Sequence, residues 1–297
     1  MNHDRRGSLL IVASSFLFSL NTLLIKLLSG GISSFTLSMI RFAAGTAAGL
    51  ILLYATGTGF RIRGGRTWLL RGVLGSTAMI LYFKTVELNG IALATLLVNT
   101  SSFFVVLNGR LFFGRSLSRS AAAGMVIAFA GVIIIYYSGS AGVPAGTLLG
   151  LSVAFIRGFT VHIIKKSSGE NHPVVVYLAA CMIGLLLSPF SFSEIPTIEL
   201  RAGLLAVGAG VIVFSAQVLM TAGLRHVSAL RNSLLLYLTI PISIILGLLI
   251  GEDLNLRFFL GSFLIVGGIL VELLGGQTAS SVPLDSPEDK GNHGSDR

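Results

Sequence analysis

Apolar stretches of about twenty residues follow one another along most of the chain, and this repetition limits the folds that the chain can adopt. A helix needs about 20 mostly apolar residues to cross the hydrocarbon core of a bilayer. Only 11% of the residues are charged, whereas soluble domains carry about a quarter. The sequence therefore predicts an all-α membrane protein and excludes a water-soluble globular fold. We expect ten transmembrane helices, at residues 8–28, 33–55, 67–87, 90–111, 119–138, 146–166, 173–191, 199–223, 227–250 and 257–274.

Basic and acidic residues alternate between the loops that connect these segments. Arginines and lysines precede the first segment and follow the second, fourth, sixth and eighth. The acidic residues of the intervening connections are Glu87, Glu194, Glu199, Glu252 and Asp253. Because basic loops stay in the cytoplasm, we expect a multi-pass protein of the cell (inner) membrane with both termini cytoplasmic. The net charge of +9 is spread over alternate loops, so it indicates membrane topology and no nucleic-acid partner.

The two halves of the chain resemble each other. A shift of 137 residues pairs Ala92 with Ala229, Leu97 with Leu234, Leu111 with Leu248, Gly114 with Gly251, Leu117 with Leu254, Gly124 with Gly261 and Gly131 with Gly268. Nearer the start of each half the shift is 139. Five spans in each half is an odd number, so the second half must enter the membrane upside down relative to the first. Inverted repeats of this kind are typical of secondary transporters, whose solute binds near the midplane between the halves.

The repeated stretches resemble the two EamA-type repeats of the drug/metabolite transporter superfamily. They read LNGIALATLLVNTSSFFVVLNGRLFFGRSLSRSAAAGMVIAFAGVIII and LRHVSALRNSLLLYLTIPISIILGLLIGEDLNLRFFLGSFLIVGGILVE. The similarity covers about residues 7 to 274, and we expect five-span repeats at 7–138 and 146–274. The remainder, 275–297, is polar and rich in Gly, Ser and Asp, which predicts a disordered cytoplasmic tail.

The second half of the chain matches the family pattern better than the first. GED at 251–253 and the mid-helix Pro241 match the family pattern in the second half. In the first half Arg115 and Phe104 stand where the acid and the proline would be.

Two basic residues also match. Lys26 corresponds to a lysine common near the end of the family's first helix, and Arg41 to an arginine frequent early in its second. The resemblance implies a carrier of small solutes such as amino acids or nucleoside-like metabolites.

Two arginines interrupt the apolar segments. Arg157 lies about eleven residues into the sixth segment and Arg41 about eight into the second, or roughly 16 and 12 Å at 1.5 Å per residue. Their repeat partners are Phe18 and Ala180, so the scaffold itself requires no charge at either position. A charge at the bilayer centre costs at least about 2.5 kcal/mol, and such residues usually face a bundle interior.

The sequence offers these arginines no obvious counter-charge. Every Asp and Glu that can be placed lies in a loop or near a helix end. We therefore expect Arg41 and Arg157 to bind an anionic group of the solute, such as a carboxylate, by forked hydrogen bonds. The alternative is that one or both brace a neighbouring helix through backbone carbonyls.

Neutral polar residues at similar depths form a second candidate lining. Lys26 either binds solute or reaches to the membrane interface. Lys84 is expected to pair with Glu87, three residues later on one helical face. The candidate substrate-binding residues are Arg157, Arg41, Lys26, Asn99, Ser102, Tyr237, Thr239, Gln217 and Tyr82.

The fifth and tenth segments carry a different signal. Each contains glycines seven residues apart, hence on one helical face, where small residues allow close packing. We expect these two spans to be peripheral packing elements without chemistry of their own.

Other function classes remain open at this point. A membrane-embedded enzyme would need a metal cluster or an activated nucleophile, and neither spacing is visible. A channel, a lipid scramblase, or an exporter of neutral or cationic metabolites are further alternatives. No cofactor or metal site is expected, and a second copy of the chain, as a homodimer, is a candidate partner besides the solute and the lipid bilayer. Coupling is open, since proton-driven carriers usually keep a titrating group inside the membrane.

Overall fold

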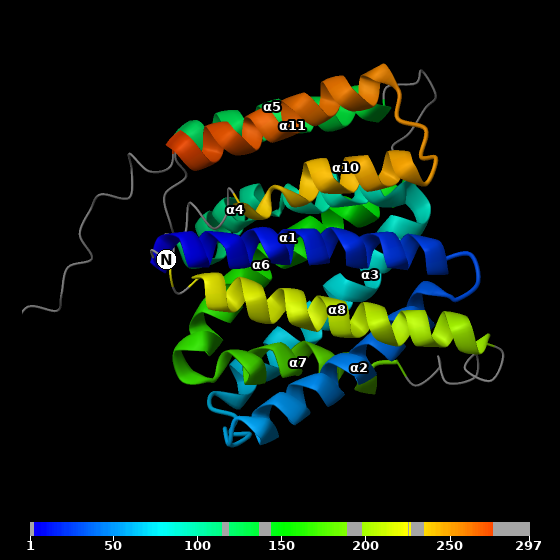
Figure 1. Ribbon diagram of the computed structural model, residues 1–297. Coiled ribbons are helices and arrows are strands. Elements are labelled where there is room, and N and C mark those ends of the chain that lie inside the picture. Colours follow the sequence, from blue (N-terminus) through cyan, green and yellow to red (C-terminus); the bar gives the residue numbers. More distant parts are fainter. Residues whose placement is uncertain are drawn as a thin grey trace, which may run out of the picture.

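All regular structure in the computed structural model is α-helical, as Figure 1 shows. It describes residues 3–114, 119–136, 144–188, 198–224, 226 and 235–275. The helices are α1 (His3–Leu28), α2 (Ser34–Ala55), α3 (Gly65–Asn99), α4 (Ser101–Phe113), α5 (Arg119–Tyr136), α6 (Ala145–Glu170), α7 (Pro173–Leu186), α8 (Leu200–Leu224), α10 (Thr239–Leu249) and α11 (Leu256–Gly275). The predicted tail, 275–297, lies outside the described residues except for Gly275.

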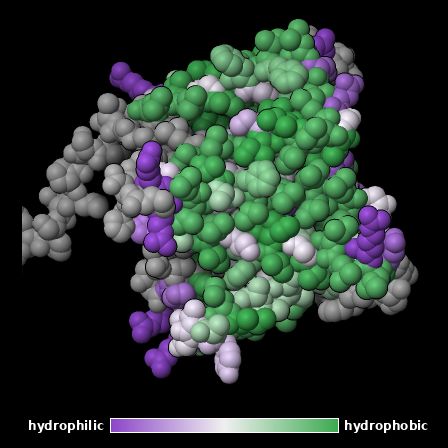
Figure 2. All heavy atoms as spheres, viewed as in Figure 1, coloured by the Kyte–Doolittle hydropathy of each residue, from purple (hydrophilic) through white to green (hydrophobic). Residues whose placement is uncertain are grey.

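The helices present an apolar surface between two hydrophilic ends. Figure 2 shows hydrophobic residues across the middle of the visible face and hydrophilic ones at its two ends, as a bilayer requires. Five helical stretches of the described residues are long and apolar enough to cross a membrane: Arg5–Leu28, Ser34–Ala55, Gly65–Phe112, Ala145–Ile164 and Leu200–Met220. The predicted all-α membrane class is confirmed.

A kink at Gly90 joins the third and fourth predicted segments within α3. Gly90 has φ 77° and ψ 179°, a left-handed conformation that glycine adopts without a Cβ clash. The Glu252 carboxylate accepts hydrogen bonds from the backbone N–H groups of Ile91 and of Ala92, the latter at 3.1 Å. A carboxylate here satisfies N–H groups that the helix itself leaves unpaired. The acid of the GED motif therefore caps a helix in the other half of the chain.

The same helix break occurs at equivalent places in the two halves. The helix formed by α3 and α4 is interrupted at Thr100, and the 137-residue shift pairs Thr100 with Tyr237 in the turn before α10. At each break an amide donates to the carbonyl three residues earlier, Phe103 to Thr100 at 3.1 Å and Ile240 to Tyr237 at 3.0 Å. The repeat is thus visible in the backbone as well as in the sequence.

Proline is not needed for this break. Pro241 follows the second one, whereas Phe104 occupies the corresponding position after the first. Both interrupted helices then end at paired glycines in the left-handed region, Gly114 with φ 65° and Gly251 with φ 79°. The shared backbone geometry therefore persists where the side chains of the two halves differ.

Helices α5 and α11 pack against each other through glycines and form a pair at one edge of the bundle in Figure 1. A Cβ at Gly124 would overlap the carbonyl oxygen of Gly268, and a Cβ at Gly268 would overlap that of Gly124. Gly131 and Gly261 are related in the same way. Residue numbers rise along one helix as they fall along the other, so the pair is antiparallel. The predicted packing role of these glycines is confirmed.

The glycine contact predicts that neighbouring glycines of α11 differ in tolerance. Gly268→Ala should lower the melting temperature of the detergent-purified protein, because its Cβ meets the backbone of α5. Gly267→Ala is the matched control, since a Cβ there meets no atom within 4 Å. Equal melting temperatures of the two variants would contradict the described packing.

The cap predicts a stability role for Glu252. Removing a helix cap costs about 1 kcal/mol, so Glu252→Ala should unfold at a lower temperature than the wild type. Asp253→Ala removes the same charge from the exposed neighbouring residue and serves as the control. If both variants unfolded at the same temperature, capping by Glu252 would be refuted.

Candidate functional site

Serines of α1 satisfy backbone groups at the break before α10. The Ser15 hydroxyl donates to the Leu235 carbonyl at 3.0 Å, and the Ser19 hydroxyl donates to the Thr239 carbonyl at 3.2 Å. The Ser243 hydroxyl in turn donates to the Ser19 hydroxyl at 3.3 Å. Irregular backbone is tolerated at membrane depth only where protein or water satisfies it. The polar residues that interrupt the first apolar segment thus hold the break in place.

Arg157 projects from α6 into the interior of the bundle. Its electrostatic neighbours are Tyr82 on α3, Tyr237 before α10 and Arg41 on α2. The residue is nevertheless exposed, although it lies near the middle of a helix that packs against α3 and α4. Arg157 thus combines an accessible surface with neighbours on other helices.

Arg41 is buried on α2, with only 6% of its surface exposed. Its guanidinium carbon lies 5.1 Å from the centroid of the Phe83 ring, within cation–π range. Tyr177, Cys181 and Tyr82 are its electrostatic neighbours. The contact with an aromatic ring offsets part of the cost of burying the charge.

Arg71 on α3 is a second buried arginine, which the sequence did not single out. Its electrostatic neighbours are Cys181, Tyr177 and Arg157, and one of its guanidinium nitrogens occupies the place where a Cβ of Gly75 would stand. It lies six residues from the start of α3, so by position alone it resembles an anchoring residue at the end of a span. The sequence did contain a signal for a buried arginine, because Arg71 lies more than one helical turn inside an apolar segment.

The three arginines have no carboxylate near them among the described residues. Their electrostatic neighbours there are tyrosines, the Cys181 thiol and one another. Within the described part of the chain, Arg71 shares this environment with Arg41 and Arg157.

Some of the predicted neutral residues contact one another, and Tyr82 is also a neighbour of Arg157. The Asn99 amide nitrogen donates to the Thr95 carbonyl at 2.7 Å and lies 3.5 Å from the Thr239 hydroxyl. Tyr82 shares a 2.8 Å hydrogen bond with Thr22 of α1.

Tyr237 completes this group, because it has both Ser102 and Arg157 as neighbours. Gln217 is half-buried on α8, a helix that packs against α1 and α2.

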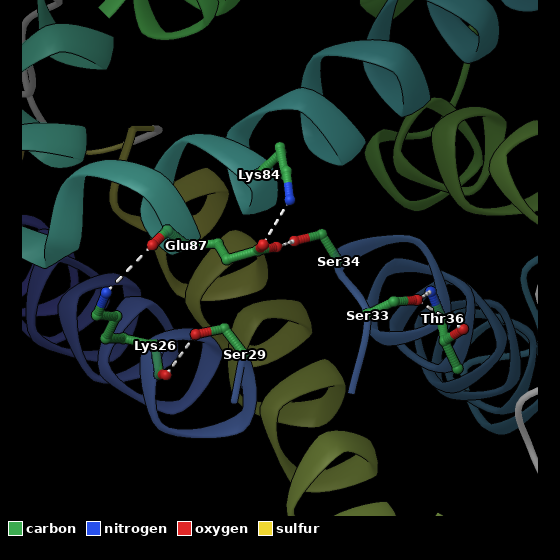
Figure 3. A network of polar contacts seen from close by, with 7 residues as sticks. All are labelled: Lys26, Ser29, Ser33, Ser34, Thr36, Lys84 and Glu87. Carbon is green, nitrogen blue, oxygen red and sulfur yellow. Dashed lines mark hydrogen bonds and ion pairs between the residues drawn. The ribbon is translucent and has the colours of Figure 1, made fainter. Parts of the chain in front are cut away.

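Lys26 belongs to a separate network formed by the end of α1, the start of α2 and the part of α3 that precedes its kink, shown in Figure 3. Its ammonium donates to the Glu87 carbonyl at 3.2 Å. The Glu87 carboxylate pairs with Lys84, as predicted, and accepts a hydrogen bond from the Ser34 hydroxyl at 2.5 Å. These contacts join α1 and α2 to α3, so the network gives Lys26 a bracing role in addition to the two considered from sequence.

Glu272 places a buried carboxylate on the last span, which was expected to be a packing element. It is only 8% exposed, on α11, and lies beside Ser102 and Tyr237. Its Oε2 atom has no hydrogen-bond partner among the described residues. Glu272 lies near the end of the last apolar segment, a position typical of an interfacial residue. The position along the sequence does not show which way the side chain faces.

Comparison with known proteins identifies relatives over nearly the whole chain. The model of the EamA-like transporter family matches residues 5–137 and again residues 144–274. The chain is 27% identical over 273 residues to the pseudopaline exporter CntI of Pseudomonas aeruginosa (strain UCBPP-PA14), which covers 90% of this chain and 93% of that protein. The exporter of the same name from a second strain is 26% identical with the same coverage.

A solved crystal structure shares the fold. Its TM-score is 0.63 at 21% sequence identity, and the match covers 93% of this chain and 99% of the other. The helical arrangement is therefore one already observed in an experimental structure.

Proposed function

Because the chain belongs to the EamA-like transporter family, we propose that it carries a small organic metabolite with an anionic group, such as an amino acid, across the cytoplasmic membrane by alternating access. The family is one of transporters, so the chain is a multi-pass membrane transporter and not an enzyme. The family model matches once in each half, and the predicted pair of EamA repeats is confirmed. The proposal concerns the solute, the site and the direction.

The observation that carries the proposal is the position of Arg157. It is exposed, yet its neighbours Tyr82, Tyr237 and Arg41 come from other helices, and none of them is acidic. A cation inside a membrane bundle needs a partner, and arginine binds carboxylates through two parallel hydrogen bonds. An anionic solute supplies the missing partner when it binds.

The remaining candidate residues would complete the site around Arg157. Tyr82, Tyr237 and Ser102 offer hydroxyl groups, and Asn99 with Thr239 offers further donors and acceptors beside the two helix breaks. Few, well-placed polar groups in a largely apolar site are the usual basis of solute specificity. Lys26 and Gln217 would act at the margin of this site.

Alternating access would follow from two inverted five-span repeats with both termini in the cytoplasm. The antiparallel contact of α5 with α11 is what a two-fold axis in the membrane plane requires of two equivalent helices. The matching breaks at Thr100 and Tyr237 provide places where each half can bend beside the solute.

Export is the proposed direction. The relatives that cover 90% of the chain are named as exporters of pseudopaline. An interior lined by arginines favours an anionic cargo over the neutral or cationic metabolites considered from sequence.

Transport by Arg157 variants tests this function. A thermal-shift screen of the purified protein against amino acids, other carboxylates and pseudopaline would first select the probe. In proteoliposomes, Arg157→Leu should then abolish counterflow of that radiolabelled probe. Arg157→Lys should weaken its binding about tenfold, because lysine keeps the charge but loses the forked geometry.

Arg201→Leu is the matched control, since Arg201 is exposed at the start of α8. Unchanged affinity in both Arg157 variants would remove Arg157 from the site. Flux without acceleration by counterflow would indicate a channel, and equal binding of an uncharged amide analogue would refute an anionic solute.

A further inference from the structure

Arg41 and Arg71 converge on the same residues of a third helix. Arg41 comes from α2 and Arg71 from α3, and both have Tyr177 and Cys181 of α7 as neighbours. All four side chains are nine-tenths buried or more, with exposed fractions of 6%, 9%, 9% and 1%. The neighbours of Arg157 are Tyr82, Tyr237 and Arg41, and it has neither Tyr177 nor Cys181 among them. Arg41 and Arg71 therefore form one group around α7, which Tyr82 and Arg41 connect to Arg157.

This group contains two buried donors without an acceptor. The Nε atoms of Arg41 and Arg71 are buried and have no hydrogen-bond partner among the described residues. The Tyr177 hydroxyl lies within hydrogen-bonding reach of Arg41 and Cys181. Leaving a buried donor unpaired carries its full desolvation cost, and the cost is greater for a charged group. An anionic ligand that accepts from both Nε atoms would remove this cost.

Two glycines lie in close contact with the side chains of this group. A Cβ at Gly45 would lie 2.9 Å from the Cys181 sulfur and 3.1 Å from the Tyr177 hydroxyl oxygen. Gly75 leaves bare helix surface, on which the guanidinium of Arg71 lies. Side chains larger than hydrogen at either position would push the donors out of their present positions.

The number of arginines in the interior sets a minimum for the negative charge of the ligand. Arg157 is within electrostatic range of both Arg41 and Arg71, so three like charges share one interior. Repulsion between them is strong where water is scarce. One negative charge would leave two of the three cations uncompensated, whereas two negative charges would pair each group of arginines.

We propose that Arg41, Arg71 and Tyr177 form a second anion-binding subsite, and that the transported solute carries at least two anionic groups. One group binds at Arg157 and the other between Arg41 and Arg71. This inference rests on the proposed function, because the first subsite is the one described above. The solute class is that of dicarboxylates and of amino acids with an additional carboxylate.

A series of matched ligands tests the second subsite. The probes are succinate, its half-amide succinamate and its diamide succinamide, with the corresponding malonate and glutarate series covering other spacings. Trp68, the single tryptophan, lies one turn from Arg71, and its indole nitrogen donates to the Val175 carbonyl of α7 at 2.9 Å. Its fluorescence therefore reports on binding, alongside the melting temperature.

The wild type should bind at least one dicarboxylate about tenfold or more tightly than its half-amide, because the half-amide leaves one subsite unpaired. Arg71→Gln should remove this preference while changing the affinity for the half-amide by less than about twofold. Arg157→Gln should weaken both ligands, and Arg201→Gln, on the exposed surface, neither.

The outcomes separate the two proposals. Equal binding of dicarboxylate and half-amide by the wild type, with loss of both in Arg157→Gln, would refute the second subsite and leave the anionic-solute function standing. The same holds if Arg71→Gln weakens the half-amide as much as the dicarboxylate. Failure of the wild type to bind any carboxylate in the series would count against both. The wild-type comparison decides the question even if Arg71→Gln fails to fold.

Discussion

The absence of water from the bilayer core is the constraint on which this structure depends, because each charge placed there needs a partner. Two described acidic residues near the helix breaks and ends are used in structure: Glu87 pairs with Lys84, and Glu252 caps the helix after Gly90. Glu272 is buried beside Ser102 and Tyr237. Among the described residues, the electrostatic neighbours of the arginines of α2, α3 and α6 are tyrosines, a thiol and one another. Positive charge without a carboxylate in direct contact therefore marks this part of the bundle.

The scaffold prepares that interior through irregular backbone. The helix break at Tyr237 brings this tyrosine beside Arg157, and serines of α1 satisfy the carbonyls of the same break. At the edge, glycine contacts hold α5 against α11 so closely that the two helices act as one packing unit. Firm packing at the edge and interrupted helices at the centre are the combination that an alternating-access carrier needs.

The membrane class and the repeated backbone geometry could be predicted from sequence, because both depend on the periodicity and spacing of residues. Long apolar segments predict the membrane class, and the 137-residue repeat pairs Gly114 with Gly251, which adopt the same left-handed conformation. The isolation of Arg157 within an apolar run indicated an interior position. Arg71 and Glu272 were not recognised, because both lie near the ends of apolar segments, where charged residues usually reach water.

The sequence by itself therefore determined the class, the repeat and the scarcity of charge, which are properties of composition and order along the chain. Only the tertiary structure decided which charges meet. The direction of a side chain around its helix places Arg71 against Tyr177 and Glu272 beside Ser102, and it depends on packing with helices far away in sequence. The depth of a residue in the membrane can be estimated by counting residues along its own helix. The side chains that it contacts on other helices depend on how several helices pack together.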